Sequence, residues 1–424
     1  MQRLSLALLF FALCSAPVGA RAESLCDADG VQASGSIYRI CMPPADQYNG
    51  ILVVWAHGFQ DAGTPVSIPE DQLCIGTFCI PEVINGLGFA FATNSYSKTG
   101  LAILQGRDDI RDLVDVFAAQ KGAPQKVYLV GASEGGIITA LSLEQHPDVF
   151  NAGLAACGPI GNFPLQINYF GDARATFQVF YPQLIPGDPF QPPAPLAANW
   201  SAYYDAIVEP FIFNPANRTR LDQWAKVAHL PFDANDYLGS LRVSVRDVLR
   251  YGVVNLTDGA QTLGGFPFDN RTRVYSGSSN DLYLNFAVPR RSADPVALTA
   301  MNTDYRTTGL LQRPLITLHT TKDQQVPYVH EPLYTLKTLA SGAFVTRHLP
   351  IKIDRFEHCN FTPGEVLVSF AIMLMYDNAL AEVSGTRSFL KPSELARFER
   401  TARALGVPTR RAGERLSFKL KTPH

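Results

Sequence analysis

Short apolar segments alternate with segments of helical periodicity over the first third of the chain and again near its end. Apolar runs typical of β-strands occur at residues 35–42, 51–56, 87–93, 127–130, 152–157 and 314–320, and a last strand is expected within 344–353. Residues 108–119 place apolar side chains at helical spacing, and a capping box at residues 362–365 opens an apolar helix. Strands that alternate with helices predict an α/β fold, with a mostly parallel central sheet and helices on both of its faces.

The alternation of strands and helices stops between residues 162 and 313. Proline-rich loops and aromatic-rich helical stretches occupy this segment, which is too long to be a loop inside a compact domain. We therefore predict an α/β core formed by residues 23–161 and 314–424, with residues 162–313 inserted as a lid over the active edge of the sheet. The aromatic side chains of the insertion either pack it against the sheet or line an apolar pocket, and both interpretations are open.

The first 22 residues have the pattern of a secretory signal peptide. Arg3 supplies a positive charge, residues 4–14 form an apolar run, and the sequence A-R-A at residues 20–22 is a small-x-small cleavage site. The mature chain is therefore expected to begin at Glu23 and to be secreted or periplasmic. The apolar run is shorter than the roughly 20 residues that a membrane-spanning helix needs, so we predict no membrane span.

The composition limits the classes of function. Of the 424 residues, 46% are hydrophobic and 17% are charged, which is typical of a globular protein. The net charge is −2, and this near-neutral balance gives no reason to expect binding to nucleic acid or to an anionic membrane surface.

Six cysteines remain once Cys14 is removed with the signal, and an even number in an exported chain predicts disulfides. Of the roughly 15 possible pairings, proximity in sequence favours Cys26–Cys41 and Cys74–Cys79, which leaves Cys157–Cys359. The competing interpretation is a metal site, but the sequence contains no C-x-x-C or H-x-x-x-H spacing. We therefore predict no metal site.

A glycine-rich turn joins the strand at residues 127–130 to the following helical pattern. Its sequence, Gly131-Ala132-Ser133-Glu134-Gly135, is a G-x-S-x-G motif with Ser133 at the apex. The turn resembles the nucleophile elbow of the α/β-hydrolase fold, in which a sharp turn lifts a serine oxygen out of the edge of the sheet. The helix N-terminus that follows favours negative charge and therefore suits an oxyanion. The alternative is an ordinary glycine-rich turn between a strand and a helix.

A serine nucleophile needs a base, and the base needs an orienting carboxylate. In α/β-hydrolases these groups follow the serine in the order acid, then histidine. His358 lies in the loop between the last strand and the capped helix, so it is the expected base. Asp323 follows the penultimate strand and is the expected acid. Asp354, four residues before His358, and Asp281, inside the insertion, are the alternative acids.

An oxyanion hole beside Ser133 needs two backbone N–H groups. The resemblance implies that one belongs to Glu134, directly after the nucleophile. The other should follow the strand at residues 51–56, where His57-Gly58-Phe59 is similar to an H-G-x pattern and Phe59 is the expected donor. His57 precedes Ser133 in the chain, so we expect it to shape this loop rather than to act as the base.

These pieces together resemble the α/β-hydrolase superfamily over residues 35–162 and 314–390, and within it the secreted serine carboxylesterase and lipase-like branches. The resemblance implies hydrolysis of a small-molecule or polymeric carboxylic ester through an acyl-enzyme, without a cofactor. His358-Cys359 is also similar to the tannase and feruloyl esterase group, where the cysteine after the histidine pairs with one before the nucleophile. Ala132 makes that pairing impossible here, so Cys157 is the cysteine that would tie down the His358 loop.

Two other classes of function are open. A secreted serine peptidase of the prolyl-peptidase type would use the same three side chains, but it needs charged residues that anchor a peptide terminus, and the sequence identifies none. A non-catalytic binding protein with a hydrolase-like fold is the third class, and the presence of Ser133, Asp323 and His358 argues against it.

Overall fold

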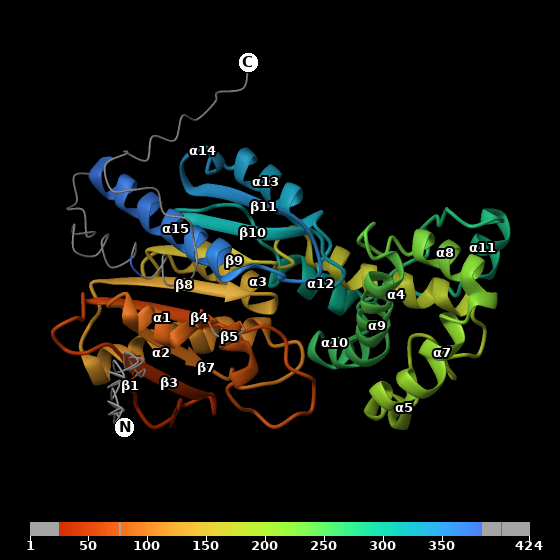
Figure 1. Ribbon diagram of the computed structural model, residues 1–424, viewed down its shortest axis with the longest axis horizontal. Helices are drawn as coiled ribbons and strands as arrows, with labels where there is room; N and C mark the ends of the chain where they lie inside the picture. The colour runs from red at the N-terminus through yellow and green to blue at the C-terminus, as the bar shows by residue number, and fades with distance from the viewer. Residues whose placement is uncertain (1–24, 76–77, 384–399, 401–424) are drawn as a thin grey trace, which may run out of the picture.

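The computed structural model describes residues 25–75, 78–383 and 400 (Figure 1). The predicted signal peptide at residues 1–22 and the end of the predicted core at residues 401–424 lie outside the described residues. Within the described ranges, no helix combines the length and the apolar character needed to cross a bilayer.

A nine-stranded sheet forms the centre of the described chain, in the order β1-β3-β7-β4-β8-β9-β10-β11, with β2 beside β3. The strands are β1 (Leu25–Cys26), β2 (Gly30–Val31), β3 (Ile37–Met42), β4 (Ile51–Ala56), β7 (Ala90–Asn94), β8 (Lys126–Ala132), β9 (Ala152–Ala156), β10 (Leu315–Lys322) and β11 (His348–Phe356). Neighbouring strands pair parallel from β7 through β4, β8, β9 and β10 to β11. The pairs β1–β3, β2–β3 and β3–β7 are antiparallel. The carboxyl ends of the parallel strands therefore meet at one edge, where open α/β sheets bind their ligands.

Helices cover both faces of the sheet because successive side chains of a strand point to opposite faces. Val54 of β4 packs with α2 and α3 on one face, and Val53 packs with α1 and α15 on the other. Every residue of β4 is buried, as its purely apolar sequence predicts. The predicted fold class, a mostly parallel sheet with helices on both faces, is therefore confirmed. The covering helices include α1 (Ile80–Gly86), α2 (Ile103–Lys121), α3 (Glu134–Gln145) and α15 (Pro363–Val383).

The segment between β9 and β10 is helical, and Figure 1 shows its helices beyond the carboxyl ends of the strands. These helices are α4 (Phe163–Phe180), α5 (Ala194–Ala198), α6 (Trp200–Tyr203), α7 (Glu209–Ile212), α8 (Arg218–Val227), α9 (Tyr237–Arg250), α10 (Leu256–Thr262), α11 (Asp281–Ala287) and α12 (Pro295–Thr303). A π-helical turn, η4 (Tyr251–Asn255), joins α9 to α10. Phe177 and Trp224 belong to a hydrophobic cluster made of insertion residues alone, so many of the aromatic side chains pack within the insertion itself. That residues 162–313 act as a lid stays a prediction.

Some element boundaries differ from the predictions. The strand expected within residues 344–353 is β11, which begins at His348 after a short helix, α14 (Phe344–Arg347), and extends to Phe356, where it still pairs with Lys322 of β10. The helix expected at residues 108–119 already begins at Ile103. Glu134 accepts the N–H of Ala102 at 2.8 Å, which ties the start of this helix to the predicted elbow.

The three disulfides are the predicted ones. Cys26–Cys41 joins β1 to β3, and Cys74–Cys79 joins the short strands β5 (Cys74–Ile75) and β6 (Phe78–Cys79). Cys157–Cys359 joins the residue after β9 to the loop between β11 and α15, across 202 positions of sequence. This third bond anchors the loop that carries His358.

Candidate active site

Ser133 lies on a sharp turn between β8 and α3. Its backbone has φ 58° and ψ −119°, a strained conformation for a residue other than glycine and the one expected at a nucleophile elbow. A Cβ atom at Gly135 would lie 2.0 Å from the Ala56 carbonyl oxygen, and one at Gly131 would lie 2.2 Å from the Gly135 carbonyl oxygen. Only glycine fits at either position, which gives a steric reason for the G-x-S-x-G motif.

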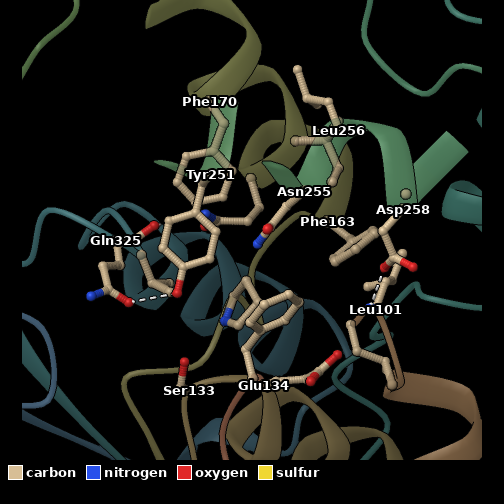
Figure 2. Close-up of a pocket in the computed structure, with 17 residues that line it drawn as sticks. Leu101, Ser133, Glu134, Phe163, Phe170, Tyr251, Asn255, Leu256, Asp258 and Gln325 are labelled. Carbon is tan, nitrogen blue, oxygen red and sulfur yellow. Dashed lines mark hydrogen bonds between the residues drawn. The ribbon is translucent and has the colours of Figure 1, made fainter. Parts of the chain in front are cut away.

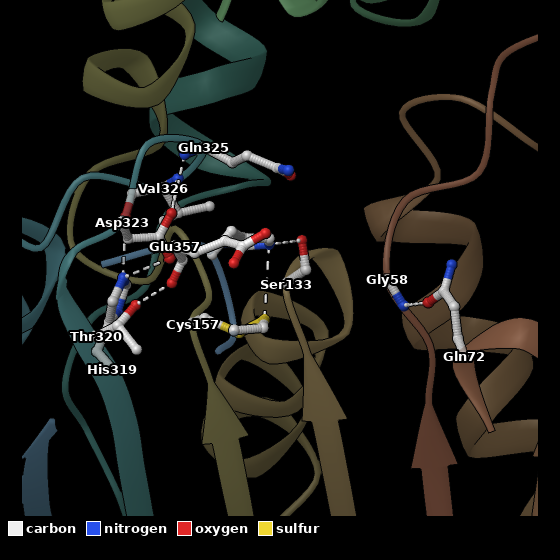
Figure 3. The surroundings of a disulfide bond; sticks show 12 residues. Gly58, Gln72, Ser133, Cys157, His319, Thr320, Asp323, Gln325, Val326 and Glu357 are labelled. Atoms are coloured by element: carbon white, nitrogen blue, oxygen red, sulfur yellow. Dashed lines mark hydrogen bonds and ion pairs between the residues drawn. A yellow bond between two sulfur atoms is a disulfide. The ribbon is translucent and has the colours of Figure 1, made fainter. Parts of the chain in front are cut away.

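The structure brings Ser133, His358 and Asp323 into direct contact (Figure 3). His358 Nε2 lies 2.9 Å from Ser133 Oγ, and its Nδ1 lies 2.7 Å from Asp323 Oδ2. Nδ1–H donates to the Asp323 carboxylate, so Nε2 is left to accept the serine proton. Asp354 instead accepts the Thr321 hydroxyl at 2.7 Å, and Asp281, the first residue of α11 in the insertion, accepts the Ser278 N–H at 2.8 Å.

The loop that carries His358 is held from several sides. Glu357 and Cys359, on either side of His358, both have positive φ, at 86° and 49°. The His358 N–H donates to Gln324 Oε1 at 2.9 Å, and the Cys157–Cys359 disulfide fixes the next residue. Residues with strained backbone persist only where the surroundings over-determine them, so this loop is a rigid support for the imidazole.

Asp323 is fully buried and accepts several hydrogen bonds. Its Oδ1 accepts the backbone N–H groups of Gln325 at 2.9 Å and Val326 at 2.8 Å. Burial alone would raise the pKa of this carboxyl, but the attraction of His358 and the hydrogen bonds to His319 and His358 outweigh it and hold the pKa below its usual range. Asp323 is therefore ionised at neutral pH.

Backbone N–H groups of two loops lie beside Ser133. The position of a Cβ on Gly58 would be 3.2 Å from Ser133 Cβ, so the loop after β4 touches the elbow. Among the described residues, neither the Phe59 N–H nor the Glu134 N–H has a hydrogen-bond partner. Gln72 holds the same loop, because its Oε1 accepts the Gly58 N–H at 2.6 Å and its Nε2 donates to the Phe59 carbonyl at 3.4 Å.

His57 lies within this loop and does not contact Ser133. Its ring is buried against Tyr96, with 3.8 Å between the ring centroids, and its Nδ1–H donates to the Gly58 carbonyl at 2.6 Å. Burial lowers the pKa of His57 to about 4, so the ring is neutral at physiological pH. This position agrees with the predicted loop-shaping role, which stays a prediction.

A largely apolar pocket opens next to Ser133 (Figure 2). It encloses about 680 Å³ of empty space, counting the part that is open to solvent. Its walls come from both the α/β core and the insertion, and they include Phe59, Leu101, Phe163, Phe170, Tyr251 and Leu256. The π-helical turn η4 supplies Tyr251 and Asn255, whose side chains project toward the elbow in Figure 2.

Two carboxyl groups also line this pocket. Glu134 is buried, and burial raises its pKa to about 8, so it carries a proton at neutral pH. Asp258 accepts the Leu101 N–H at 2.6 Å, and Lys98 Nζ lies 3.6 Å from its other oxygen. The pocket is therefore close to neutral in charge at physiological pH.

One group of metal-ligating residue types converges in the described ranges. The ligand atoms of Cys157, His358 and Cys359 lie within 4.8 Å of one another. The two sulfur atoms are bonded to each other in a disulfide, so neither is a thiolate that could bind a metal.

Three functional features were missed by the sequence reasoning. Several helices and strands separate Gln72 from the elbow in the sequence, and the contact of Gln72 with Gly58 has no sequence signature. His319 lies inside an apolar strand pattern and was not considered, although it contacts Asp323. The pocket wall at Phe170 and Tyr251 was covered only by the general expectation that aromatic residues of the insertion line a pocket.

The order of the strands, the elbow after β8, and the side chains after β10 and β11 together define the α/β-hydrolase fold. The model of the prolyl oligopeptidase family matches residues 84–163, which include the elbow but are a minor part of the chain. A comparison with curated proteins gave no match.

Solved structures with a similar fold include esterases, lipases and peptidases. An esterase from Aspergillus oryzae is 14% identical, over 77% of this chain and 71% of that one, with a TM-score of 0.42. Candida antarctica lipase A in its closed state is 14% identical, over 89% of this chain and 84% of that one, with a TM-score of 0.44. Pyrococcus horikoshii acylaminoacyl peptidase is 10% identical, over 85% of this chain and 41% of that one, with a TM-score of 0.42. The similarity to the tannase group stays a prediction.

Proposed function

We propose that this protein is an exported serine hydrolase that cleaves carboxylic esters of apolar or aromatic acids. The observation that carries the proposal is the hydrogen-bonded chain from Ser133 through His358 to Asp323, which opens onto an apolar pocket. A hydroxyl, an imidazole and a buried carboxylate in this order can generate a nucleophile at neutral pH. We assign Ser133 as the nucleophile, His358 as the base and Asp323 as the orienting acid.

The proposed reaction proceeds in two half-reactions. His358 Nε2 accepts the Ser133 proton while Oγ attacks the ester carbonyl, and the same proton then passes to the departing alcohol. The acyl group is left on Ser133. A water molecule gives a proton to His358 and attacks the acyl-enzyme, which releases the acid and returns the proton to Ser133. Throughout, Asp323 keeps the Nδ1–H in place and stabilises the imidazolium.

The proposed oxyanion hole consists of the N–H groups of Phe59 and Glu134. Neither donor has a partner among the described residues; Glu134 begins α3 directly after Ser133, and Phe59 lies on the loop after β4 that adjoins Ser133. Free backbone donors aimed at developing charge are the requirement for stabilising a tetrahedral oxyanion. The N-terminus of α3 adds a favourable partial positive charge at the same place.

The pocket favours an ester over a peptide substrate. A peptidase of the prolyl-peptidase type would need a charged group for a peptide terminus. Asp258 is already engaged by Lys98 and by a backbone N–H, and Glu134 carries a proton at neutral pH. The remaining wall accepts an apolar or aromatic acyl group, and we propose that residues 162–313 serve as the lid that supplies Phe163, Phe170 and Tyr251 to it. Three disulfides support export to an oxidising compartment.

The test compares hydrolysis of p-nitrophenyl butyrate and p-nitrophenyl benzoate with hydrolysis of prolyl and aminoacyl p-nitroanilides. Both esters should be cleaved faster than any anilide. Ser133→Ala should reduce kcat by at least about 10⁴-fold, because it removes the nucleophile. Ser201→Ala, at an exposed serine of α6, is the matched control and should retain full activity. Anilide turnover that exceeds ester turnover, or a Ser133→Ala variant that still cleaves esters at the original rate, contradicts the proposal.

A further inference from the structure

A second buried imidazole lies on the other side of Asp323 from His358. His319, on β10, is fully buried, and its Nε2 lies 3.4 Å from Asp323 Oδ2. This is the same oxygen that accepts the His358 Nδ1–H at 2.7 Å. The Nδ1 atom of His319 lies 3.4 Å from Oε1 of Glu331, in the first turn of α13 (His330–Ala340). The Nε2–H of His319 donates to the Val326 carbonyl at 2.9 Å, so its hydrogen is shared between that oxygen and Asp323. His319 therefore lies between two buried carboxyl groups, and Figure 3 shows its contact with Asp323.

Two carboxyl groups that contact one buried imidazole favour a positive charge on it. His319 is placed to carry that charge. Its Nδ1 and the Glu331 Oε1 form no regular hydrogen bond among the described residues, and they become a matched donor and acceptor once His319 is an imidazolium. Burial alone would lower the pKa of His319, but its close contacts with the carboxyl groups of Asp323 and Glu331 outweigh burial and raise the pKa to about 10.

The neighbouring histidines do not compete for this charge. Burial lowers the pKa of His330 to about 3 and that of His348 to about 4, so both rings are neutral. Thr317 donates to Glu331 at 2.6 Å and lies 3.1 Å from His348 Nε2, which continues the buried polar chain. The other titratable groups that face this cluster or adjoin His358 are Tyr169, Asp247, Tyr328, Lys337 and Glu357.

We propose that His319, held by Glu331, is a positioning residue that keeps Asp323 ionised and weakens the attraction of Asp323 for a protonated His358. This inference rests on the proposed roles of Ser133, His358 and Asp323. Because Asp323 is shared between two imidazoles, its negative charge is partly neutralised by His319. The acid limb of the pH profile of the reaction should therefore depend on whether His319 is present beside Asp323.

The size of the effect follows from the geometry. The two imidazoles contact the same oxygen at 2.7 and 3.4 Å, so their nearest nitrogen atoms are at most about 6 Å apart. At an effective dielectric constant of about 20, a unit charge at this distance moves a titration by up to about 2 pH units. We expect His319→Gln to move the acid limb of the pH profile of kcat/KM upward by about 1 unit, and Glu331→Gln to move it downward by about 0.5 unit, since Glu331 is farther away.

The test measures kcat/KM for p-nitrophenyl butyrate against pH in the wild type, His319→Gln, Glu331→Gln and the double variant. His348→Gln is the matched control, because it removes a buried imidazole of the same chain that carries no charge, and its acid limb should not move. An NMR titration of ¹⁵N-labelled histidines follows the protonation of His358 without any turnover. A failure of the proposed esterase activity therefore remains distinguishable from a failure of this inference.

Opposite shifts in the two single variants support the inference. An acid limb that stays within about 0.2 pH unit of the wild type in folded His319→Gln overturns it, as does a shift of the same sign in both single variants. If near-ultraviolet circular dichroism shows that His319→Gln does not fold, the double variant takes its place. That variant buries no charge at either position, and it too should shift the acid limb upward.

Discussion

Glu134 allows a test of how burial of one carboxyl group affects stability. Its side chain is buried at the edge of the pocket, and its Oε1 accepts the Ala102 N–H at the start of α2. Glu134→Gln keeps the volume and the accepting oxygen but removes the ionisation. The comparison therefore isolates the cost of charging this side chain inside the folded protein.

The sign and the size follow from linkage. Burial raises the pKa of Glu134 from 4.5 to about 8, so the folded state holds this proton more tightly than the unfolded chain does. The stabilising contribution is present in full below pH 4.5 and is lost progressively as the pH rises to about 8. The loss approaches about 5 kcal/mol at its limit and should grow by about 2.5 kcal/mol between pH 6 and pH 9.

The assay is urea unfolding of wild type and Glu134→Gln at pH 6, 7.5 and 9, with the disulfides intact. The variant should gain unfolding free energy relative to the wild type as the pH rises. Glu365→Gln is the matched control. Burial alone would raise the pKa of Glu365, but the hydrogen bonds from Arg355 and from Thr362 of the capping box outweigh it and lower the pKa, so Glu365 titrates below this range. Wild-type and Glu134→Gln stabilities that run parallel from pH 6 to pH 9 would refute the reasoning.

Three further perturbations test other parts of the structure. Replacing Cys157 and Cys359 together by alanine should lower the unfolding free energy by about 3 kcal/mol and reduce kcat more than it raises KM. Urea unfolding and steady-state kinetics measure these two effects. Unaltered kinetics would show that the disulfide does not position the loop that carries His358. Gln72→Ala should lower kcat by about 10- to 100-fold with little change in KM, because it releases the loop that carries a proposed oxyanion donor; a change confined to KM contradicts this. Asp377→Asn removes one charge of the buried Lys126–Asp377 ion pair and should cost about 3 kcal/mol in unfolding free energy, a value that a thermal shift below 1 °C would rule out.

Much of the fold follows from local sequence signals. The purely apolar run of β4 predicts burial on both faces, and the structure places α1 and α15 on one face and α2 and α3 on the other. The chain order of acid and histidine after the elbow led to Asp323 and His358, which the structure brings to Ser133. The end of β11 at Phe356 lies outside the predicted range because it depends on the pairing with β10, which is not a local property.

The sequence by itself determined the features whose causes are local. These are the glycines that the close crossing of strand and helix requires, the apolar pattern of each strand, and the cysteine spacing that led to three disulfides. Only the tertiary structure decided which distant side chains meet. Gln72 reaches Gly58, and His319 stands between Asp323 and Glu331, because separate elements pack at fixed distances that no pattern within one segment encodes. Periodicity and sterics act between near neighbours in the chain, whereas the composition of a buried polar cluster depends on how strands, loops and helices are assembled.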